Sequence, residues 1–339
     1  MMDPAELHAR TLTLDTHIDI PWPDGPDPFG DTRRRVDIGK MRRGGLVAGI
    51  FAAYVPQGPR TPEGHAAAKA RALAMLDAIN GMGRTENGLS ARVATGVSAI
   101  ERAHADGVQV VIPAVENGYA VGDDLRVLAE LRARGAVYMT MTHNGHNNLA
   151  DSSNPRQDLG DAAEEHGGLS PLGRNAVAEM NRLGMLVDIS HTSPKAAMQC
   201  ALHSRTPVVA THSCARALCD VPRNVDDLML DAVRDCGGVV HVTAVPSFVK
   251  PGGKAGEVTV SDFADHVDYI VNRIGLAHCG ISSDFDGGGG FSGWRDASES
   301  ANVTAELVRR GYGAHEIGQL WSGNFLRLLR AAETVAANA

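Results

Sequence analysis

Short apolar runs alternate with amphipathic segments over most of the chain. Eight runs rich in Val, Ile, Ala and Thr are predicted to be strands, at 11–16, 46–55, 108–115, 136–142, 184–190, 207–212, 237–243 and 279–284. Most are apolar nearly throughout, which is typical of a parallel sheet covered on both faces. Helical periodicity fills the intervals, at 62–81, 96–105, 123–134, 171–183, 193–203, 225–235 and 261–274, and continues at 298–310 and 314–331. This alternation predicts right-handed βαβ units.

Eight strands with intervening helices favour an α/β fold of the (β/α)8 TIM-barrel type over a doubly wound sheet. Two helix starts carry clear signals, because Ser170-Pro171 and Ser193-Pro194 each place an N-cap serine before a proline. The long segment 56–107 after the second strand indicates a slightly distorted barrel. Gly- and Pro-rich stretches are short and no repeat is evident, so we expect one domain over residues 1–339.

Composition narrows the class of protein. Hydrophobic residues make up 43% of the 339 residues and charged residues 21%, so the chain can bury a sizeable core. A net charge of −8 argues against a polyanionic partner, because like charges repel. We therefore expect a soluble protein that does not bind nucleic acid.

Cysteine usage and apolar runs bear on cellular location. The five cysteines are odd in number and include no Cys-x-x-Cys pair, which favours free thiols in a reducing compartment. The sequence shows no signal-peptide or lipid-anchor pattern. Its longest apolar run, Leu46–Val55, is about half of the ~20 residues that a membrane helix needs. We therefore expect a cytoplasmic protein without membrane contact.

Ligand-type side chains stand at the carboxyl ends of six of the eight predicted strands. They are His17 and Asp19 after the first strand, Glu116 after the third, His143 after the fourth, His191 after the fifth, His212 after the sixth and Asp284 after the eighth. In such a barrel these ends meet at one rim, where active sites lie. Four imidazoles and three carboxylates on one rim would be costly to desolvate without a cation. The joint pattern therefore predicts a divalent metal site.

Each of these residues taken alone also has a structural interpretation. A single His-x-Asp sequence is often a hydrogen-bonded pair near a turn, although the spacing of His17 and Asp19 sends both side chains to one face of an extended backbone. A lone histidine such as His143 is more often a structural imidazole. Glu116 or Asp284 could cap a helix or pair with an arginine. The metal interpretation depends on the joint pattern.

Other candidate residues are weaker. Six further histidines fall in loops or on helices and are expected to be solvated: His146, His166, His203, His266, His278 and His315. His241 lies inside the seventh strand, where we expect a core histidine or one that supports a ligand. The run Gly287–Gly290 favours a flexible loop over a phosphate site, and Arg33–Arg35 a solvated charge run. The segment Asn144–Gly168 is either part of a lid or a plain surface loop.

The residues at the strand ends resemble those of the membrane, or renal, dipeptidases, a branch of the metal-dependent amidohydrolase superfamily. The resemblance covers nearly the whole chain. It rests on seven segments in order, at 15–22 (DTHIDIPW), 115–118 (VENG), 140–143 (TMTH), 184–191 (GMLVDISH), 207–213 (PVVATHS), 223–227 (RNVDD) and 283–287 (SDFDG). Seven motifs at the expected strand ends make the resemblance highly specific.

The resemblance implies a zinc-dependent dipeptidase with two divalent metal ions, expected to be Zn²⁺. His17 and Asp19 would hold one ion and His191 and His212 the other, with Glu116 bridging them. Arg223, His143 and Trp22 would contact the substrate, and Asp284 would move the proton. A hydroxide shared by two such cations would be the nucleophile. His143 would polarise the peptide carbonyl.

Relatives of this kind cleave dipeptides with a free C-terminal carboxylate, including those with a D residue there. The resemblance is incomplete at two points. Mammalian relatives are secreted and lipid-anchored, and they present a tyrosine to the substrate after the seventh strand, where this chain reads Thr243-Ala-Val-Pro-Ser-Phe248. An N-acyl-amino-acid deacylase, a lactonase or a phosphotriesterase on the same binuclear barrel is an alternative, as is a catalytically silent ligand-binding barrel. The sequence is also compatible with a homo-oligomer.

Overall fold

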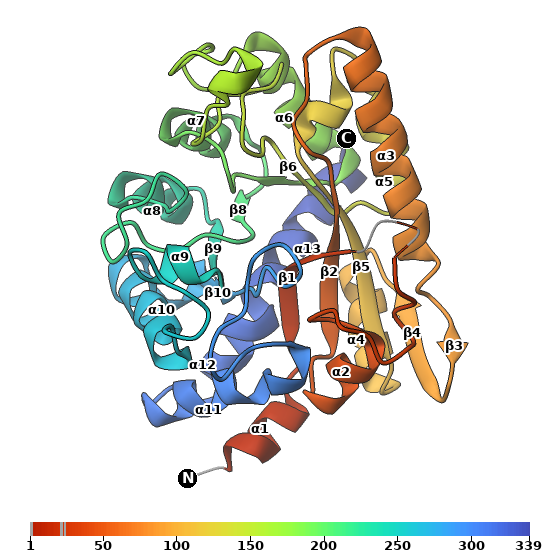
Figure 1. Cartoon of the computed structure of the whole chain (residues 1–339), viewed down its shortest axis with the longest axis vertical. Helices are drawn as coiled ribbons and strands as arrows, with labels where there is room; N and C mark the ends of the chain where they lie inside the picture. The colour runs from red at the N-terminus through yellow and green to blue at the C-terminus, as the bar shows by residue number, and fades with distance from the viewer. Residues whose placement is uncertain (1–2, 21–22, 24) are drawn as a thin grey trace.

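Parallel strands form a nearly closed barrel in the computed structural model, which describes residues 3–20, 23 and 25–339. In these residues eight strands follow the order β1-β2-β5-β6-β7-β8-β9-β10 around the barrel (Figure 1). Their bounds are β1 (Leu14–Asp19), β2 (Ala48–Tyr54), β5 (Gln109–Glu116), β6 (Tyr138–Thr140), β7 (Leu186–Asp188), β8 (Val209–Ala210), β9 (Val239–Val242) and β10 (Cys279–Ile281). The predicted (β/α)8 fold class is confirmed.

The barrel closes where the ends of its first and last strands meet. Ile18 forms a parallel bridge with Phe285. The amide of Asp284 donates to the carbonyl of His17 (3.0 Å), and the amide of Asp19 donates to the carbonyl of Phe285 (3.0 Å). This seam places Asp284 beside His17 and Asp19, although they come from opposite ends of the chain.

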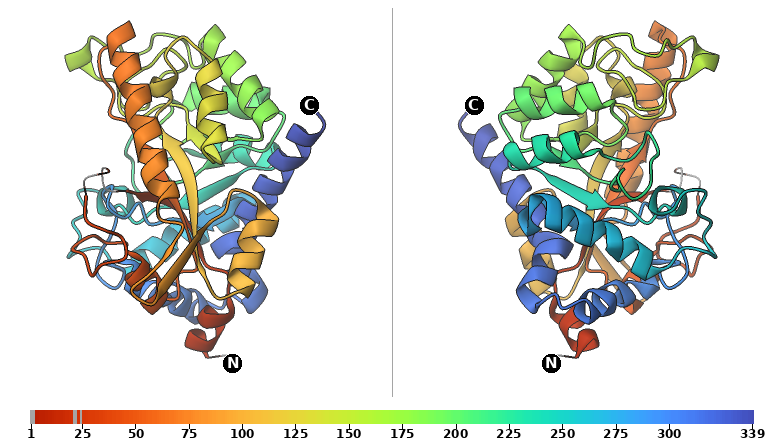
Figure 2. Two further views of the ribbon diagram at one scale, coloured as in Figure 1. Left: turned by 90° about the vertical axis from the view of Figure 1, so that its right-hand side faces the viewer. Right: turned by 90° about the vertical axis from the view of Figure 1, so that its left-hand side faces the viewer.

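The irregular segment after the second barrel strand contains a hairpin that the sequence analysis missed. Strands β3 (Thr85–Glu86) and β4 (Leu89–Val93) pair antiparallel across a turn at Asn87 and Gly88, which have φ of 52° and 72°. Asn-Gly is the preferred pair for such a turn, because both residues tolerate positive φ. Strand β4 then pairs parallel with β5, so this part of the sheet extends beside the barrel (Figure 2).

Helices cover the outside of the barrel, with α3 and α5 on one flank and α8 and α10 on the other (Figure 1). The helices are α1 (Pro4–Arg10), α2 (Ile38–Arg43), α3 (Pro62–Asn80), α4 (Val97–Ala105), α5 (Arg126–Ala133), α6 (Pro171–Leu183), α7 (Pro194–His203), α8 (Asp227–Asp235), α9 (Pro246–Val249), α10 (Val260–Ile274), α11 (Ala301–Arg309), α12 (Ala314–Gly318) and α13 (Asn324–Ala337). Ser170 and Ser193 cap α6 and α7 as predicted, each accepting a backbone N–H. The single helix predicted over 314–331 is instead divided by a π-helical turn at Gln319–Gly323.

Two buried clusters make up the core. One contains interior-facing strand residues such as Ile112, Leu186 and Val239, together with Phe325 and Leu329 of α13. The other lies mainly between the strands and the surrounding helices. Alternate residues of a strand share a face, so the interior series on β5 that includes Ile112 ends in Glu116. The apolar interior therefore gives way to polar side chains at the carboxyl ends of the strands.

The state of the cysteines and the apolar character of the helices bear on two further expectations. All five cysteines are free, at Cys200, Cys214, Cys219, Cys236 and Cys279. No helix among the described residues combines the length and apolar composition that a membrane crossing requires.

Candidate functional site

Glu116, the last residue of β5, lies at the centre of the predicted ligand set. Its Oε1 atom is 3.1 Å from Nε2 of His191, 3.3 Å from Nε2 of His212 and 3.9 Å from Nε2 of His143. Its Oε2 atom is 3.6 Å from Nε2 of His17. The barrel thus brings together four histidines from β1 and from the segments after β6, β7 and β8 around one carboxylate.

Asp19 completes one side of this cluster. Its Oδ1 atom is 3.8 Å from Nε2 of His17, so the two side chains do share a face of β1. The strand itself runs from Leu14 to Asp19 rather than over 11–16, which puts both residues inside it. Glu116, His17, His191 and His212 are buried, whereas Asp19 and His143 are partly exposed.

The donor atoms suit a divalent cation. Two groups of three have their ligand atoms within 4.8 Å of one another: His17, Glu116 and His212, and Glu116, His143 and His191. Among the described residues, Nε2 of His17 and Oδ1 of Asp19 are buried without a hydrogen-bond partner. Buried polar atoms are normally paired, so two unpaired ligand-type atoms 3.8 Å apart fit a bound metal ion. His143 belongs to the second group, although the family resemblance implies contact with the substrate for this residue.

Burial and neighbouring charges shift the pKa values of the site's carboxylates in opposite directions. Burial alone would raise the pKa of Glu116, but the charge of His17 and hydrogen bonding from His191 hold it well below its usual range. Burial and the neighbouring charge of Glu116 raise the pKa of Asp19 well above its usual range. Burial also raises the pKa of Asp284, to about 7, although the charge of His17 partly offsets this effect. A nearby cation would favour the ionised form of each carboxylate.

A pocket of about 340 Å³ opens onto this cluster. It is lined by Asp19, Tyr54, Glu116, His143, Asn144, Asn154, His191, Arg223, Val245, Phe248, Asp284 and Gly287. Gly287 is needed for its shape, because a Cβ atom there would lie 2.2 Å from Oδ1 of Asp284 and 2.7 Å from Oδ2 of Asp19. The acidic residues and the apolar pair Val245 and Phe248 thus line the same cavity.

Arg223 is buried in the wall of this pocket. Its Nη1 donates to Oγ of Ser213 (3.0 Å) and its Nη2 to the carbonyl of His212 (2.9 Å). The guanidinium lies 5.5 Å from the ring centre of Phe248. Its Nε is buried without a hydrogen-bond partner in the described part of the chain, and burial lowers the pKa of Arg223. A buried guanidinium with donors to spare suits an anionic ligand.

Several site residues have unusual backbone conformations. His191, Asp284 and Asp286 have positive φ values of 66°, 56° and 65°. Few residues other than glycine adopt such values, and they persist where the surrounding structure enforces them, often at functional sites. The backbone is thus bent where the chain leaves β7 and β10, and the side chains of His191 and Asp284 turn into the rim.

The segment 144–168 contributes to the wall of the site. Oγ of Ser152 lies 2.5 Å from the carbonyl of His143 and 3.2 Å from that of His191. His146 is fully buried, with its Nδ1 accepting from the amide of Ser152 (2.9 Å) and its Nε2 3.0 Å from the carbonyl of Ala162. The expectation that His146 is solvated is therefore wrong, and the segment is more than a plain surface loop.

Three further expectations need correction. His266 is buried, because its ring bridges the amide of Ala215 (3.0 Å) and the carbonyl of Val249 (2.9 Å). Arg34 is not a solvated charge, since it pairs with Asp286 (3.2 Å) and donates to the carbonyl of Asp19. The run Gly287–Gly290 is a hydrogen-bonded turn rather than a flexible loop, because the amide of Gly290 donates to the carbonyl of Ala244.

The remaining expectations for single residues are met in part. His203 and His315 are exposed, as expected, whereas His166 and His278 are half-buried. His241 is buried inside β9, 3.3 Å from the carbonyl of Ala210. Trp22, the predicted pocket-lining residue, lies outside the described residues.

Sequence reasoning missed Tyr54, which ends β2 and lines the pocket. Its ring packs edge-on against His143, with 4.8 Å between ring centres. Burial, together with the charge of Glu116, raises the pKa of Tyr54 to about 12. The signal was available, because Tyr54 stands at a strand end like the predicted ligands.

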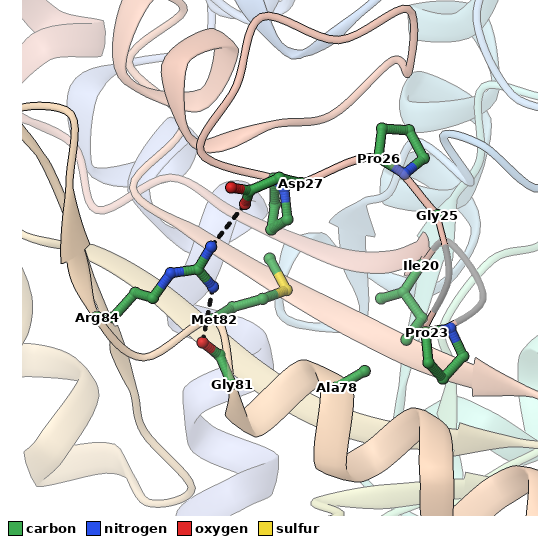
Figure 3. A pocket seen from close by; sticks show the side chains of 10 residues that line it. Ile20, Pro23, Gly25, Pro26, Asp27, Ala78, Gly81, Met82 and Arg84 are labelled. Carbon is green, nitrogen blue, oxygen red and sulfur yellow. Dashed lines mark hydrogen bonds and ion pairs between the residues drawn. The ribbon is translucent and has the colours of Figure 1, made fainter.

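A second cavity of about 310 Å³ lies away from the ligand cluster, between the segment after β1 and the end of α3 (Figure 3). Arg84 spans it, donating to the carbonyl of Gly81 (2.9 Å) and to Oδ1 of Asp27 (2.6 Å). Ile20, Ala78 and Met82 supply apolar lining. Because its charged groups already pair with each other, we assign no chemistry to this cavity.

A parallel barrel with imidazoles and carboxylates at the carboxyl ends of its strands is typical of metal-dependent hydrolases of the amidohydrolase type. The profile of the membrane dipeptidase family, Peptidase family M19, matches residues 2–339. The chain therefore belongs to this family, as the sequence motifs indicated.

Individual relatives agree with this assignment. Dipeptidase aclJ of Aspergillus oryzae is 37% identical over 223 residues, which cover 66% of this chain and 51% of the relative. Dipeptidase 3 of Rattus norvegicus is 31% identical over 311 residues, or 90% of this chain and 60% of the relative. The chain thus spans only about half the length of the curated relatives that it matches.

Solved structures match over nearly the whole chain. The probable dipeptidase PvdM from Pseudomonas aeruginosa superposes with a TM-score of 0.92 at 31% identity, covering 98% of both chains. A metallopeptidase from Rhodobacter sphaeroides, liganded with a phosphinate mimic of the dipeptide L-Ala-D-Ala, gives a TM-score of 0.82 at 25% identity. That match covers 95% of this chain and 99% of the other.

Proposed function

We propose that this protein is a metal-dependent dipeptidase that hydrolyses dipeptides with a free C-terminal carboxylate. The observation that carries the proposal is the position of Arg223, a buried guanidinium in the wall of the pocket that also contains Glu116 and His191. The described residues give Arg223 hydrogen bonds and no ion pair, and a buried unpaired charge is costly. A substrate carboxylate would supply the missing partner.

Two divalent cations, in our proposal Zn²⁺, would be held by His17, Asp19, Glu116, His191 and His212. Bound there, they would lower the pKa of a water molecule and polarise the scissile carbonyl. Arg223 would hold the substrate by the substrate's C-terminal carboxylate. The pocket of about 340 Å³ would limit the length of the peptide that can bind. Binding energy from one end of the substrate is thereby used to position the bond to be cleaved.

The chain's own residues supply the proton transfers. Asp284 lies in the pocket and closes the barrel seam beside His17, where it can take a proton from the attacking water and pass it to the leaving amine. His143 can donate a hydrogen bond to the oxyanion that develops on the carbonyl. Its pKa is lowered, chiefly by burial, which favours a neutral ring.

The proposal extends to dipeptides whose C-terminal residue is D. Support comes from the Rhodobacter sphaeroides relative, which was solved with a mimic of L-Ala-D-Ala. The same pocket could also accommodate an N-acyl amino acid, which offers a carboxylate at the same distance from an amide. Deacylase and lactonase activities therefore belong in the test.

The test is a substrate panel measured on the purified chain with and without added Zn²⁺. It contains L,L and L,D dipeptides, the same dipeptides amidated at the C-terminus, N-acetyl amino acids and simple lactones. We expect Zn²⁺-dependent cleavage of free dipeptides and at least tenfold lower kcat/KM for the amidated forms. Faster turnover of N-acetyl amino acids or lactones would contradict the dipeptidase proposal.

A further inference from the structure

A buried carboxylate that lies outside the predicted ligand set occupies the barrel interior below the rim. Asp188 ends β7 and is fully buried. Its Oδ1 accepts the amides of Ser190 and Thr211, each at 3.0 Å. Its Oδ2 accepts the hydroxyls of Thr140 (2.6 Å) and Thr211 (2.7 Å). Four donors therefore surround one carboxylate.

The hydroxyl of Thr211 connects this carboxylate to a predicted metal ligand. Oγ1 of Thr211 is 2.8 Å from Nδ1 of His212. An ionised carboxylate can only accept, so the single hydroxyl proton of Thr211 is used in the bond to Asp188. Only lone pairs of that hydroxyl remain for His212, and Nδ1 must therefore carry a hydrogen. In a neutral ring, Nε2 then has the free lone pair.

The lone pair on Nε2 of His212 lies among the other predicted metal ligands. Nε2 of His212 lies 3.3 Å from Oε1 of Glu116 and 3.0 Å from Nε2 of His191. We propose that Asp188, acting through Thr211, fixes His212 in the form with hydrogen on Nδ1 and thereby directs the Nε2 lone pair at the metal site. This inference rests on the metal-binding part of the proposed function. Asp188 and Thr211 are positioning residues in this scheme, because neither lines the pocket.

His17 shows the same principle with different groups. The hydroxyl of Tyr138 donates to the carbonyl of Thr16 (3.0 Å), so it can only accept from Nδ1 of His17, 2.9 Å away. His191 differs, because its Nδ1 is buried without a partner among the described residues. Two of the three buried histidines around Glu116 are thus oriented by hydroxyl groups. Of these two hydroxyls, the one beside His212 donates to a carboxylate, and the one beside His17 donates to a backbone carbonyl.

Asp188→Asn is the most discriminating variant. The amide oxygen of the asparagine can still accept the two backbone amides, which leaves its NH₂ group facing the hydroxyls. Thr211 would then accept from the amide and release its own proton toward Nδ1 of His212. The favoured form of His212 would change to the one with hydrogen on Nε2, which cannot bind a metal through that atom.

The first measurement is nitrogen NMR of ¹⁵N-histidine-labelled chain, with His212 assigned by substitution, in the chelator-treated protein. We expect hydrogen on Nδ1 of His212 in the wild type and on Nε2 in Asp188→Asn. The second measurement is Zn²⁺ affinity by competition with a chromophoric chelator, without substrate. Loss of a group that orients a metal-binding histidine typically costs about 10–100-fold in affinity, and we expect a loss in that range.

Matched threonine variants separate hydrogen bonding from packing. Thr211→Val keeps the shape and removes the hydroxyl, whereas Thr211→Ser keeps the hydroxyl. Thr243→Val is the control, because the buried hydroxyl of Thr243 has no hydrogen-bond partner in the described part of the chain. We expect weakened Zn²⁺ binding in Thr211→Val, recovery in Thr211→Ser and no change in Thr243→Val.

Three results would overturn the proposal. The first two are an unchanged hydrogen position on His212 in Asp188→Asn and equal Zn²⁺ affinities in Thr211→Val and the wild type. The third is an equal loss in Thr211→Val and Thr211→Ser, since packing would then explain the effect. Denaturant unfolding shows whether each variant folds. If Asp188→Asn does not fold, the Zn²⁺ affinity of Tyr138→Phe tests the same principle at His17. Normal Zn²⁺ binding without dipeptide turnover would count against the proposed activity and leave this inference intact.

Discussion

The carboxylate of Glu116 and the imidazole of His17 face each other at the carboxyl ends of β5 and β1, with 3.6 Å between Oε2 and Nε2. The other oxygen of Glu116 faces His191 and His212. Glu116 therefore has one oxygen directed at each half of the predicted ligand set. This arrangement supports a bridging role and leads to the first prediction.

Glu116→Gln should reduce the metal content of the purified chain well below two equivalents. The amide keeps the size of the side chain but removes the negative charge that would hold two dications close together. Metal content is measured by elemental analysis after gel filtration. Glu130→Gln on α5 is the control, because Glu130 pairs with Lys69 at the surface. Two retained equivalents with full activity would exclude the bridging role.

Asp284→Asn should lower kcat by about 10²–10⁴-fold, the usual contribution of general acid–base catalysis. Its carboxyl group lies in the pocket, and an amide in its place cannot shuttle a proton. The neighbouring Asp286→Asn should have a much smaller effect, because that side chain accepts from the amides of Arg35 and Val36 instead. Both variants should keep the wild-type metal content. Near-normal turnover in metal-loaded Asp284→Asn would remove this residue from the mechanism.

Gly287→Ala should impair catalysis while the fold is retained. The added Cβ would lie 2.2 Å from Oδ1 of Asp284, so that carboxylate must move. Displacing a catalytic group by about 1 Å can cost on the order of 10²-fold in rate, and we expect a loss of that size in kcat/KM. Gly318→Ala is a suitable control, because nothing lies within 4 Å of the added atom there. Wild-type kinetics in Gly287→Ala would show that the pocket tolerates the displacement.

The rim residues could be predicted from sequence because the carboxyl ends of parallel strands meet on one side of a barrel. The ends of two apolar runs were therefore enough to place His191 and Asp284 at the rim. The positive φ values that turn them inward left no comparable sequence signal. Tyr54 was missed because an aromatic residue at the end of an apolar run is also typical of a core boundary.

Burial of polar residues was less predictable, because it depends on partners distant in sequence. His146 is satisfied by the carbonyl of Ala162, and Arg34 pairs with Asp286, which comes from the far end of the chain. Neither contact is implied by the spacing of residues around the histidine or the arginine. The hairpin at 85–93 was missed for another reason, since its short strands carry too few residues to show a period of two.

His266 provides a prediction on stability. Burial lowers its pKa, although the hydrogen bond to Val249 and the charges of Asp265 and Asp262 partly offset this effect. The unfolded ring takes up a proton near pH 6.5 while the folded ring resists it, so the unfolded state binds more protons below that pH. The free energy of unfolding should therefore fall as pH drops below about 6.5, by at most ~1.4 kcal/mol per pH unit from this residue.

Denaturant unfolding of the metal-free chain at pH 7 and pH 5 measures this effect. His266→Gln removes the titrating group, so its free energy of unfolding should depend less on pH than that of the wild type, even if it is lower at pH 7. The exposed His203 supplies the matched control for a His-to-Gln replacement, as His203→Gln. The same pH dependence in His266→Gln and the wild type would show that His266 does not contribute.

Arg223→Lys should lose most of the preference for a free C-terminal carboxylate. The guanidinium is held by Ser213 and the carbonyl of His212, and it packs against Phe248. Its remaining donors can bind a carboxylate through two parallel bonds, which a lysine ammonium cannot reproduce. We expect kcat/KM for free dipeptides to fall more than tenfold, while the much slower cleavage of amidated dipeptides changes little. The ratio of the two kcat/KM values is the decisive measurement, because a general loss of folding or metal would lower both together. If the wild type cleaves amidated and free dipeptides equally well, Arg223 does not bind the carboxylate. The activity would then be that of a broader amidohydrolase.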